Sequence, residues 1–296
     1  MPSRRTYLAT LAAAGLAGCV GETPGTGTDS ESPPTTTAPG TAAPSNVIVE
    51  AAAVQYAYRH IEQVDWNGIR AADGQFVFVT VDVAEPRSAG NQNATRSGEA
   101  RPADSAPAKS AFTLVADGES YAPIEPEYGY LVDLAVPGSQ YWPENEDAEP
   151  RGWLVFGIPA ELDSAPTLRL DRDPAPAEWA LDVDLATSPP PAWEWSVDTP
   201  ETVAPDTTFD IAITAENVGD GPGTFRGAVN FSYPLYRPKG FDIALDPGES
   251  GTESVEASTE DADPGQEIDY GIRTPAGQGS VSVTIESDSS SGNESA

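Results

Sequence analysis

The chain offers few side chains for nucleophilic or metal chemistry. It contains one histidine, His60, and one cysteine, Cys19, among 296 residues. A zinc site with two histidines and a blue-copper site are therefore excluded, and a histidine-based triad has a single candidate base. The sequence has neither a Gly-x-Ser-x-Gly turn nor a glycine-rich phosphate loop. Tyr56 and Tyr58 alternate with His60, which predicts one strand face and a half-buried, structural histidine.

Carboxylates are the remaining groups for acid–base or cation chemistry. Asp and Glu number 47 against 15 Lys and Arg, a formal net charge of −32. With so many, close pairs arise by chance, so a pair alone does not indicate a glycosidase-type site. The densest run, residues 144–149, has the oxygen ligands that calcium prefers, but its spacing is not that of an EF-hand and favours a solvated loop. We expect no enzyme activity, no cofactor and no metal site, and a carboxylate hydrolase is the least favoured alternative.

Cys19 has a different chemistry because of the residues that precede it. A basic pair, Arg4 and Arg5, is followed by a short apolar segment and by the tetrad Leu-Ala-Gly-Cys that ends at Cys19. This order resembles a twin-arginine (Tat) lipoprotein signal peptide over residues 1–19, whose lipobox cysteine is lipidated and becomes the new N-terminus. The apolar segment is too short to cross a bilayer as a helix. The resemblance implies lipid attachment at Cys19 and a place on the extracellular face of the cell membrane.

The negative charge is spread along the chain. The acidic excess is similar in residues 46–187 and 188–286, and the chain has two lysines, Lys109 and Lys239. At molar salt the Debye length falls to about 3 Å, so such a surface repels itself little. This composition is typical of proteins from salt-loving archaea. It argues against nucleic-acid binding, which needs a basic surface.

Composition also divides the chain into segments. Residues 20–45 are mostly Thr, Ser, Pro and Gly, which predicts a disordered linker. Residues 46–187 and 188–286 each alternate polar and apolar side chains in about seven short runs, with a Ser-Pro-Pro-Pro break at 188–191. Residues 287–296 form a polar tail expected to be disordered. The expected fold class is all-β: two tandem immunoglobulin-like antiparallel β-sandwich domains after a signal peptide and a disordered linker.

Two parts of the sequence resemble known families. Residues 74–83 and 152–159 resemble an uncharacterised family of extracellular immunoglobulin-like lipoprotein domains, in which no catalytic residues are established; this resemblance covers residues 46–187. Residues 209–219, which end in Asn-Val-Gly, together with the Pro-Gly turn in 245–250, resemble cell-adhesion-related β-sandwich modules of bacteria and archaea. Such modules act as spacers or binding surfaces, so the second resemblance implies a surface role without a particular ligand.

The sequence also contains candidate sites for glycosylation and for contact with a partner. Three Asn-x-Ser/Thr sequons make Asn93, Asn230 and Asn293 glycosylation candidates, and Asn230 falls within a predicted strand. Residues 86–110 form a predicted loop with more basic than acidic side chains. A loop of this length is either disordered or a contact for an acidic surface or glycan.

These features predict a cell-surface, lipid-anchored, non-enzymatic protein that serves as an interaction or adhesion/scaffold module of the envelope. The expected partners are membrane lipid through Cys19 and an envelope protein or glycan. The alternative is a solute- or polysaccharide-binding lipoprotein, whose cleft would use some of the six Trp and ten Tyr side chains.

Overall fold

The computed structural model describes residues 46–63, 66–83, 106–126, 130–143, 150–173, 176–232 and 237–287. Within these ranges the regular elements are strands and two short 3-10 turns, η2 (Lys109–Ala111) and η3 (Asp184–Thr187), with no α-helix. The strands form four sheets, and their named pairs are antiparallel except for the parallel pair of β10 with β16. The all-β class expected from the period-two alternation is thus confirmed.

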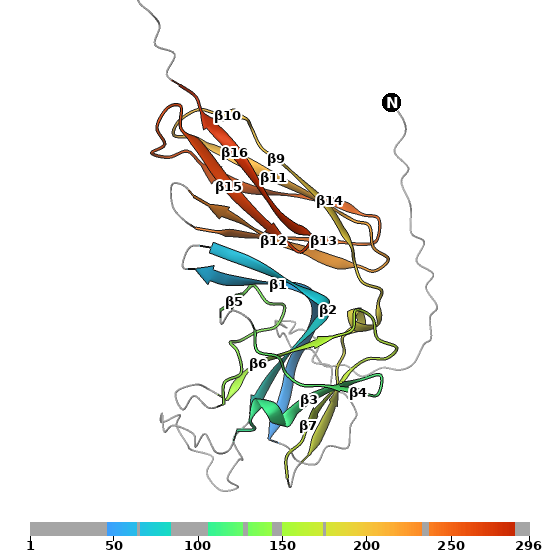
Figure 1. Cartoon of the computed structure of the whole chain (residues 1–296). Coiled ribbons are helices and arrows are strands. Elements are labelled where there is room, and N and C mark those ends of the chain that lie inside the picture. Colours follow the sequence, from blue (N-terminus) through green and yellow to red (C-terminus); the bar gives the residue numbers. More distant parts are fainter. Residues whose placement is uncertain are drawn as a thin grey trace, which may run out of the picture. The chain divides into compact units, whose positions relative to one another are not determined.

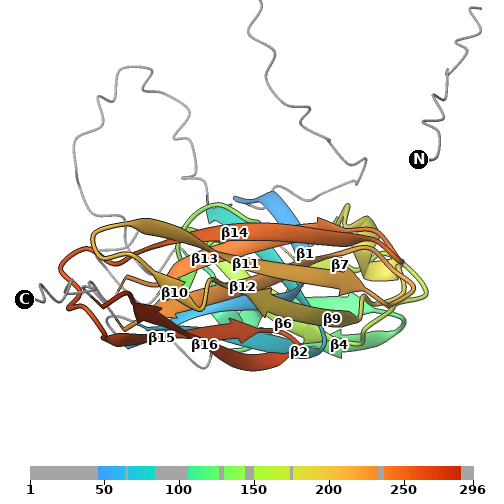
Figure 2. The ribbon, with the colours of Figure 1, turned by 90° about the horizontal axis from the view of Figure 1, so that it is seen from above.

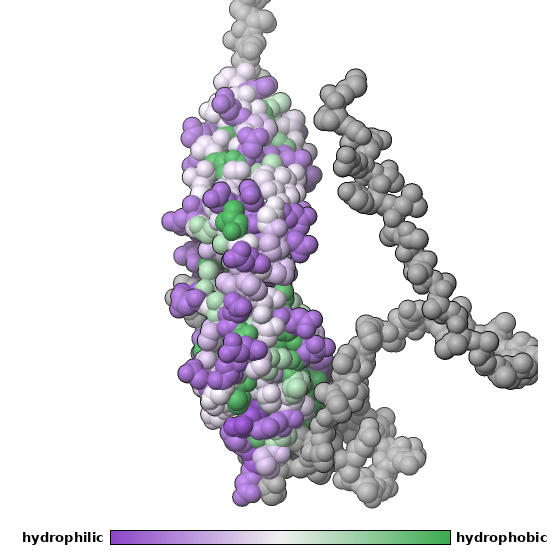
Figure 3. All heavy atoms as spheres, turned by 90° about the vertical axis from the view of Figure 1, so that its right-hand side faces the viewer, coloured by the Kyte–Doolittle hydropathy of each residue, from purple (hydrophilic) through white to green (hydrophobic). Residues whose placement is uncertain are grey.

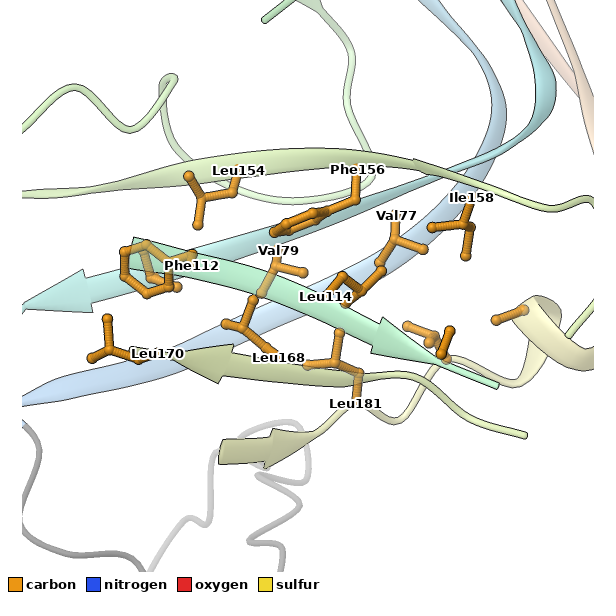
Figure 4. Packing of buried hydrophobic residues seen from close by; sticks show 14 of the residues in the cluster. Val77, Val79, Phe112, Leu114, Leu154, Phe156, Ile158, Leu168, Leu170 and Leu181 are labelled. Carbon is orange, nitrogen blue, oxygen red and sulfur yellow. The ribbon is translucent and has the colours of Figure 1, made fainter. Parts of the chain in front are cut away.

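The first sandwich packs the sheet β5-β1-β2-β6 against the sheet β4-β3-β7-β8. Its strands are β1 (Val47–Gln63), β2 (Trp66–Val83), β3 (Phe112–Ala116), β4 (Glu119–Tyr121), β5 (Leu131–Val132), β6 (Arg151–Ile158), β7 (Thr167–Leu170) and β8 (Ala177–Ala180). Val77 and Val79 of β2 and Phe156 of β6 point between the sheets toward Leu114 and Leu168 (Figure 4). Each such side chain contributes about 1.5–3 kcal/mol on burial.

The strand β2 is buried on both of its faces. Val77 and Val79 enter the core between the sheets, while Phe76 and Phe78 belong to a second cluster on the opposite face with Trp153. The rings of Phe78 and Trp153 meet edge to face at 5.7 Å between centroids. Burial on two faces explains the unbroken apolar run of this strand, because neither face is left for polar side chains.

The second sandwich packs the sheet β10-β16-β15-β12-β13 against the sheet β14-β11-β9, whose three strands follow one another across the view in Figure 2. Its strands are β9 (Trp193–Asp198), β10 (Thr202–Val203), β11 (Thr208–Asn217), β12 (Gly223–Phe231), β13 (Lys239–Leu245), β14 (Ser250–Ser258), β15 (Glu267–Thr274) and β16 (Gly277–Ile285). Phe225 lies at the centre of this core, with ring centroids of Trp193 and Phe241 at 5.5 and 6.1 Å. The immunoglobulin-like sandwich is held by this apolar packing.

The hairpin of β1 and β2 is longer than the first sandwich. Its strands pair from Val47 opposite Val83 to Gln55 opposite Phe76, with one shift of register between Val49 and Ala51, and the next pair is Ala57 opposite Ala71. Residues 72–75 therefore form a large bulge, and the hairpin bends there (Figure 1). Beyond the bend, the hairpin leaves β6 and contacts β12 and β15 of the second sandwich, and Arg59 also reaches β13.

Candidate functional site at the joint between the sandwiches

The outer face of β13, β12 and β15 forms a seat for the hairpin, and we call this contact the joint. The seat consists of cross-strand neighbours: Asp242 with Arg226, Gly240 with Ala228, Ala228 with Arg273, and Asn230 with Gly271. Its centre is made of glycine and alanine, so another backbone can approach closely. Residues 225–231 of β12 are all buried, which requires a cover on each face of the strand. The hairpin is the cover on the outer face.

Arg59 of β1 places its guanidinium on the seat. Its Nη1 donates hydrogen bonds to the carbonyl oxygens of Gly227 at 3.0 Å and Phe241 at 2.9 Å, and to Asp242 Oδ1 at 3.2 Å. The side chain is 4% exposed, and a Cβ on Gly240 would collide with its guanidinium. A cation buried this deeply requires hydrogen-bonded partners. The absence of a side chain at Gly240 makes room for it.

Two carboxylates balance two arginines at the joint. Asp242 of β13 accepts from Nε of Arg226 at 2.9 Å as well as from Arg59. Asp133, which follows β5, lies 2.9 Å from Nη2 of Arg59. Asp133 has a φ of 53°, the left-handed region that costs most side chains about 1 kcal/mol or more. The ion pair therefore joins both sandwiches through one arginine.

The tip of the hairpin adds polar and aromatic contacts. The backbone N–H of Asn67 donates to Asn230 Oδ1 at 2.8 Å, and Nδ2 of Asn230 donates to the carbonyl oxygen of Asn67 at 3.0 Å. Beside them, the guanidinium carbon of Arg273 lies 5.2 Å from the ring centroid of Trp66, a cation–π distance. A Cβ on Gly271 would lie 3.1 Å from the Trp66 ring, so only a very small residue fits beneath it.

His60 is a packing residue of the hairpin. It is 2% exposed, more deeply buried than the half-buried position that its sequence pattern predicted. Its ring meets that of Tyr58 edge to face at 6.1 Å, and its Nε2 lies 3.5 Å from Glu62 Oε1. A Cβ on Gly68, its cross-strand partner, would collide with the imidazole. Burial on this scale keeps the ring away from a substrate.

The linker between the sandwiches is fixed to the second one by Asn217, which ends β11. Its Nδ2 donates to the carbonyl oxygen of Gly221 at 2.8 Å, and its Oδ1 accepts from the backbone N–H of Ala192 at 3.3 Å and of Gly219 at 3.1 Å. A Cβ on either glycine would collide with the backbone of the prolines at 189–191. The Asn-Val-Gly sequence therefore holds the proline linker against the loop.

Most of the sequence-predicted site residues cannot be placed. The lipid site Cys19, the export residues Arg4 and Arg5, and the sequons at Asn93 and Asn293 lie outside the described residues. So do the signal peptide, the 20–45 linker, the acidic run at 144–149 and most of the 86–110 loop. The domain boundaries remain predictions. Asn230 is placed, and its amide is buried at the joint.

The described part of the chain has neither a cluster of metal-binding side chains nor a helix that could span a membrane. It contains no group of three or more His, Cys, Asp or Glu side chains arranged to hold a metal ion. It also contains no helix with the length and apolar character needed to cross a bilayer.

Large apolar side chains are exposed singly. On the face shown in Figure 3, hydrophilic and neutral residues dominate and hydrophobic ones are scattered. The most exposed aromatic side chains among the described residues are Tyr130, at 76%, and Trp142, at 56%. The backbone N–H of Ile61, itself partly exposed, donates to the carbonyl oxygen of Tyr130 at 2.9 Å. Scattered residues of this kind do not by themselves define a binding surface.

Comparison with known proteins gives only partial likenesses. No protein-family model matches the chain, and no curated protein matches its sequence. A β-glucosidase from Listeria innocua in complex with gluconolactone is similar over 32% of this chain and 16% of its own, with 16% identity and a TM-score of 0.28. The chain thus spans about one-sixth of the length of that enzyme.

Two other solved structures are similar at the same level. The CARDB domain of the PF1109 protein from Pyrococcus furiosus, in complex with di-metal ions, is similar over 33% of this chain and 96% of its own, with 10% identity and a TM-score of 0.29. The DNA glycosylase AlkC from Pseudomonas fluorescens is similar over 35% and 32%, with 14% identity and a TM-score of 0.26. At these TM-scores none of the likenesses transfers a function.

Proposed function

We propose that the protein is a lipid-anchored, non-enzymatic surface protein whose two sandwiches are held together as one interaction or scaffold module of the envelope. The observation that carries this proposal is the joint, where the buried Arg59 binds two carbonyl oxygens and Asp242 of the second sandwich. Both sandwiches fall within one compact unit of the chain. A module of this kind presents the surfaces of its two sandwiches in a fixed relation to each other.

The joint supports a fixed relation because one arginine, buried in the contact, takes its partners from both sandwiches, and a change that removes a partner leaves its charge buried and unpaired. Removing one partner of a fully buried ion pair costs about 3–5 kcal/mol. Asp242 is 39% exposed and Asp133 is 62% exposed, so solvent reduces this penalty on the carboxylate side. The carbonyl partners of Arg59 and the Asn67–Asn230 bonds add to it. Domains joined only by a flexible linker need no such contacts.

The anchor rests on the sequence of the leader. The tetrad before Cys19 and the pair Arg4-Arg5 support export and lipidation. The non-enzymatic part is supported by the packing of His60 and by the use of the joint's arginines in internal contacts. Envelope protein or glycan is the proposed partner of the module.

A second function, glycan or solute binding, is favoured by the exposed rings of Tyr130 and Trp142. Aromatic rings that face solvent can stack on sugars. If this function holds, envelope polysaccharide will quench the tryptophan fluorescence of the wild type but not that of Trp142→Ala. Equal quenching in the two proteins would contradict it.

The surface proposal is tested by photo-crosslinking on intact cells with three proteins: the wild type, Cys19→Ser and Arg59→Gln. A photo-reactive residue replaces Glu216 on the exposed side of β11. We expect the wild type to capture one defined envelope component, Cys19→Ser to leave the membrane fraction, and Arg59→Gln to stay anchored but capture less. Retention of Cys19→Ser in the membrane fraction would overturn the anchor. Equal capture by Arg59→Gln would overturn the role of the joint.

A further inference from the structure

The outer edge of β2 near the hairpin tip has backbone groups that the sheet does not satisfy. Asn67 lies opposite Ile61, and the N–H of Ile61 points to Tyr130 on the other side of β1. Asn67 therefore belongs to a non-hydrogen-bonded pair, and its own N–H and C=O point away from β1. The neighbouring strand β6 pairs only with residues 75–82 of β2. Both groups of Asn67 must find partners elsewhere.

Asn230 supplies both partners from one carboxamide. Its Oδ1 accepts from the N–H of Asn67, and its Nδ2 donates to the C=O of the same residue. This is the pair of bonds that one residue of a neighbouring antiparallel strand would make through its own N–H and C=O. Asn230 is completely buried, and its cross-strand neighbour Gly271 adds no side chain that would block the approach.

We propose that Asn230 is the residue that sets the register of the joint, with its carboxamide taking the place of the N–H and C=O of a residue on a neighbouring strand. Because donor and acceptor must meet one residue of β2 together, a hairpin shifted by one position would present a residue whose N–H and C=O point toward β1 instead. The Asn-Phe-Ser sequon at this position then has a structural role. A glycan on Nδ2 would occupy the space of Asn67, so the folded head carries none at Asn230. This inference goes beyond the proposed surface function and does not depend on it.

The test compares purified wild type with three variants by hydrogen exchange and mass spectrometry. Asn230→Asp keeps the shape but replaces the Nδ2 donor with an oxygen that faces the carbonyl of Asn67. Ser232→Ala removes the sequon and keeps the carboxamide. Asn67→Ala removes a side chain but keeps the backbone groups that Asn230 binds.

We expect Asn230→Asp to accelerate exchange across residues 57–71 about tenfold or more, since a buried unsatisfied group is costly. Exchange in β11 should stay unchanged. Ser232→Ala changes an exposed side chain and should remain within about threefold of the wild type. Asn67→Ala keeps the backbone groups that Asn230 binds, so it should accelerate exchange less than Asn230→Asp does. Peptide mapping of wild type from cells should find Asn230 unmodified.

Several results would overturn the proposal. A glycan on Asn230 of the folded protein would do so directly, as would unchanged exchange in Asn230→Asp. Equal acceleration in Ser232→Ala would assign the effect to the Ser232 hydroxyl, which donates to Asp269 O at 2.6 Å. If Asn230→Asp does not fold, the test is made on the backbone amide of Asn67 in the wild-type protein. It must exchange at least about tenfold slower than an unstructured amide, and an unprotected amide would contradict the assignment.

Discussion

Arg59 of β1 and Asp242 of β13 form two hydrogen bonds across the joint, Nη1 to Oδ1 at 3.2 Å and Nη2 to Oδ2 at 3.4 Å. They are separated by 183 positions in the sequence. The pair is accompanied by two bonds from Arg59 to backbone carbonyl oxygens. A fork-shaped guanidinium suits this arrangement better than the single ammonium of lysine.

Replacing Arg59 tests the energetic weight of this pair. Arg59→Gln should lower the free energy of unfolding by about 2–3 kcal/mol, below the range for a fully buried pair because Asp242 is partly exposed. Arg59→Lys should lose nearly as much, since a single ammonium cannot also reproduce the contacts of Nη2 with Asp133 and with the second oxygen of Asp242. Urea titration measures both. The control is Arg169→Gln, whose pair with Glu178 is exposed and should lose less than about 1 kcal/mol.

A substitution at Gly221 tests whether the proline linker at 189–191 rests on the loop that follows β11. Gly221→Ala would place a methyl group against the backbone of Pro189, so the linker must move. We expect a loss of about 1–3 kcal/mol, typical of overpacking, together with faster exchange in residues 217–221. Gly157→Ala is the matched control, because its added carbon would make an ordinary contact of 3.8 Å with Ile124. A loss no larger than that of the control would mean that the linker does not rest on this loop.

The raised pKa of Tyr270 predicts that the folded state loses stability at alkaline pH. Burial raises the pKa of Tyr270 to about 12, against an ordinary value of 10.0. The folded state therefore holds the proton more tightly, and stability is complete below pH 10 and declines as the pH rises toward 12. Tyr270→Phe should remove this part of the decline in a urea titration repeated at several pH values. The pKa values of Tyr56 and Tyr121 are also raised, chiefly by burial, so these side chains contribute to the decline in the same direction.

The same variant has an expected effect at neutral pH. The hydroxyl of Tyr270 is buried and has no hydrogen-bond partner among the described residues. Removing a buried unsatisfied hydroxyl avoids its desolvation penalty. Tyr270→Phe should thus leave the free energy of unfolding unchanged or raise it by about 1 kcal/mol. A loss above about 1 kcal/mol would show that the hydroxyl has a partner.

The exposed face of β14, β11 and β9 predicts a salt requirement. Asp210 lies directly opposite Glu256, and Glu216 lies opposite Glu194. Like charges at such positions destabilise a sheet by about 0.2–1 kcal/mol per pair, and molar salt screens them. We expect near-ultraviolet dichroism to be lost on dilution from molar salt, and Glu216→Gln to lower the salt concentration at the midpoint. Glu178→Gln, which removes a partner of Arg169, should not lower it.

The strands that follow a period-two pattern could be predicted from the sequence. Phe209, Ile211 and Ile213 of β11 alternate with polar residues because one face of the strand packs on the core and the other faces solvent. The apolar spacing of residues 179–185 also predicts a strand, but β8 ends at Ala180 and η3 begins at Asp184. Its apolar side chains, Leu181 and Val183, are buried although they lie outside the strands. Apolar spacing alone therefore does not distinguish a strand from a buried irregular segment at this position.

The joint could not be predicted from alternation, because β12 at its centre is buried on both faces. Residues 66–75, half of β2, include glycines and no clear period. One signal was available in the composition. Residues 223–231 of β12 contain no Asp or Glu, although the chain has 47, and they include Arg226 and Asn230. The absence of carboxylates agrees with the burial of β12 on both faces, but it does not identify such a face by itself, because β16 also has none and is partly exposed.

A distance measurement between the sandwiches tests the central claim most directly. Cys19 is the only cysteine in the sequence, so spin labels on Ser120→Cys and Glu216→Cys can be placed in a Cys19→Ser background. Double electron–electron resonance should give one narrow distance distribution, which broadens when Arg59→Gln is added. A broad distribution before that change, or an equally narrow one after it, would contradict a joint that holds the two sandwiches as one body.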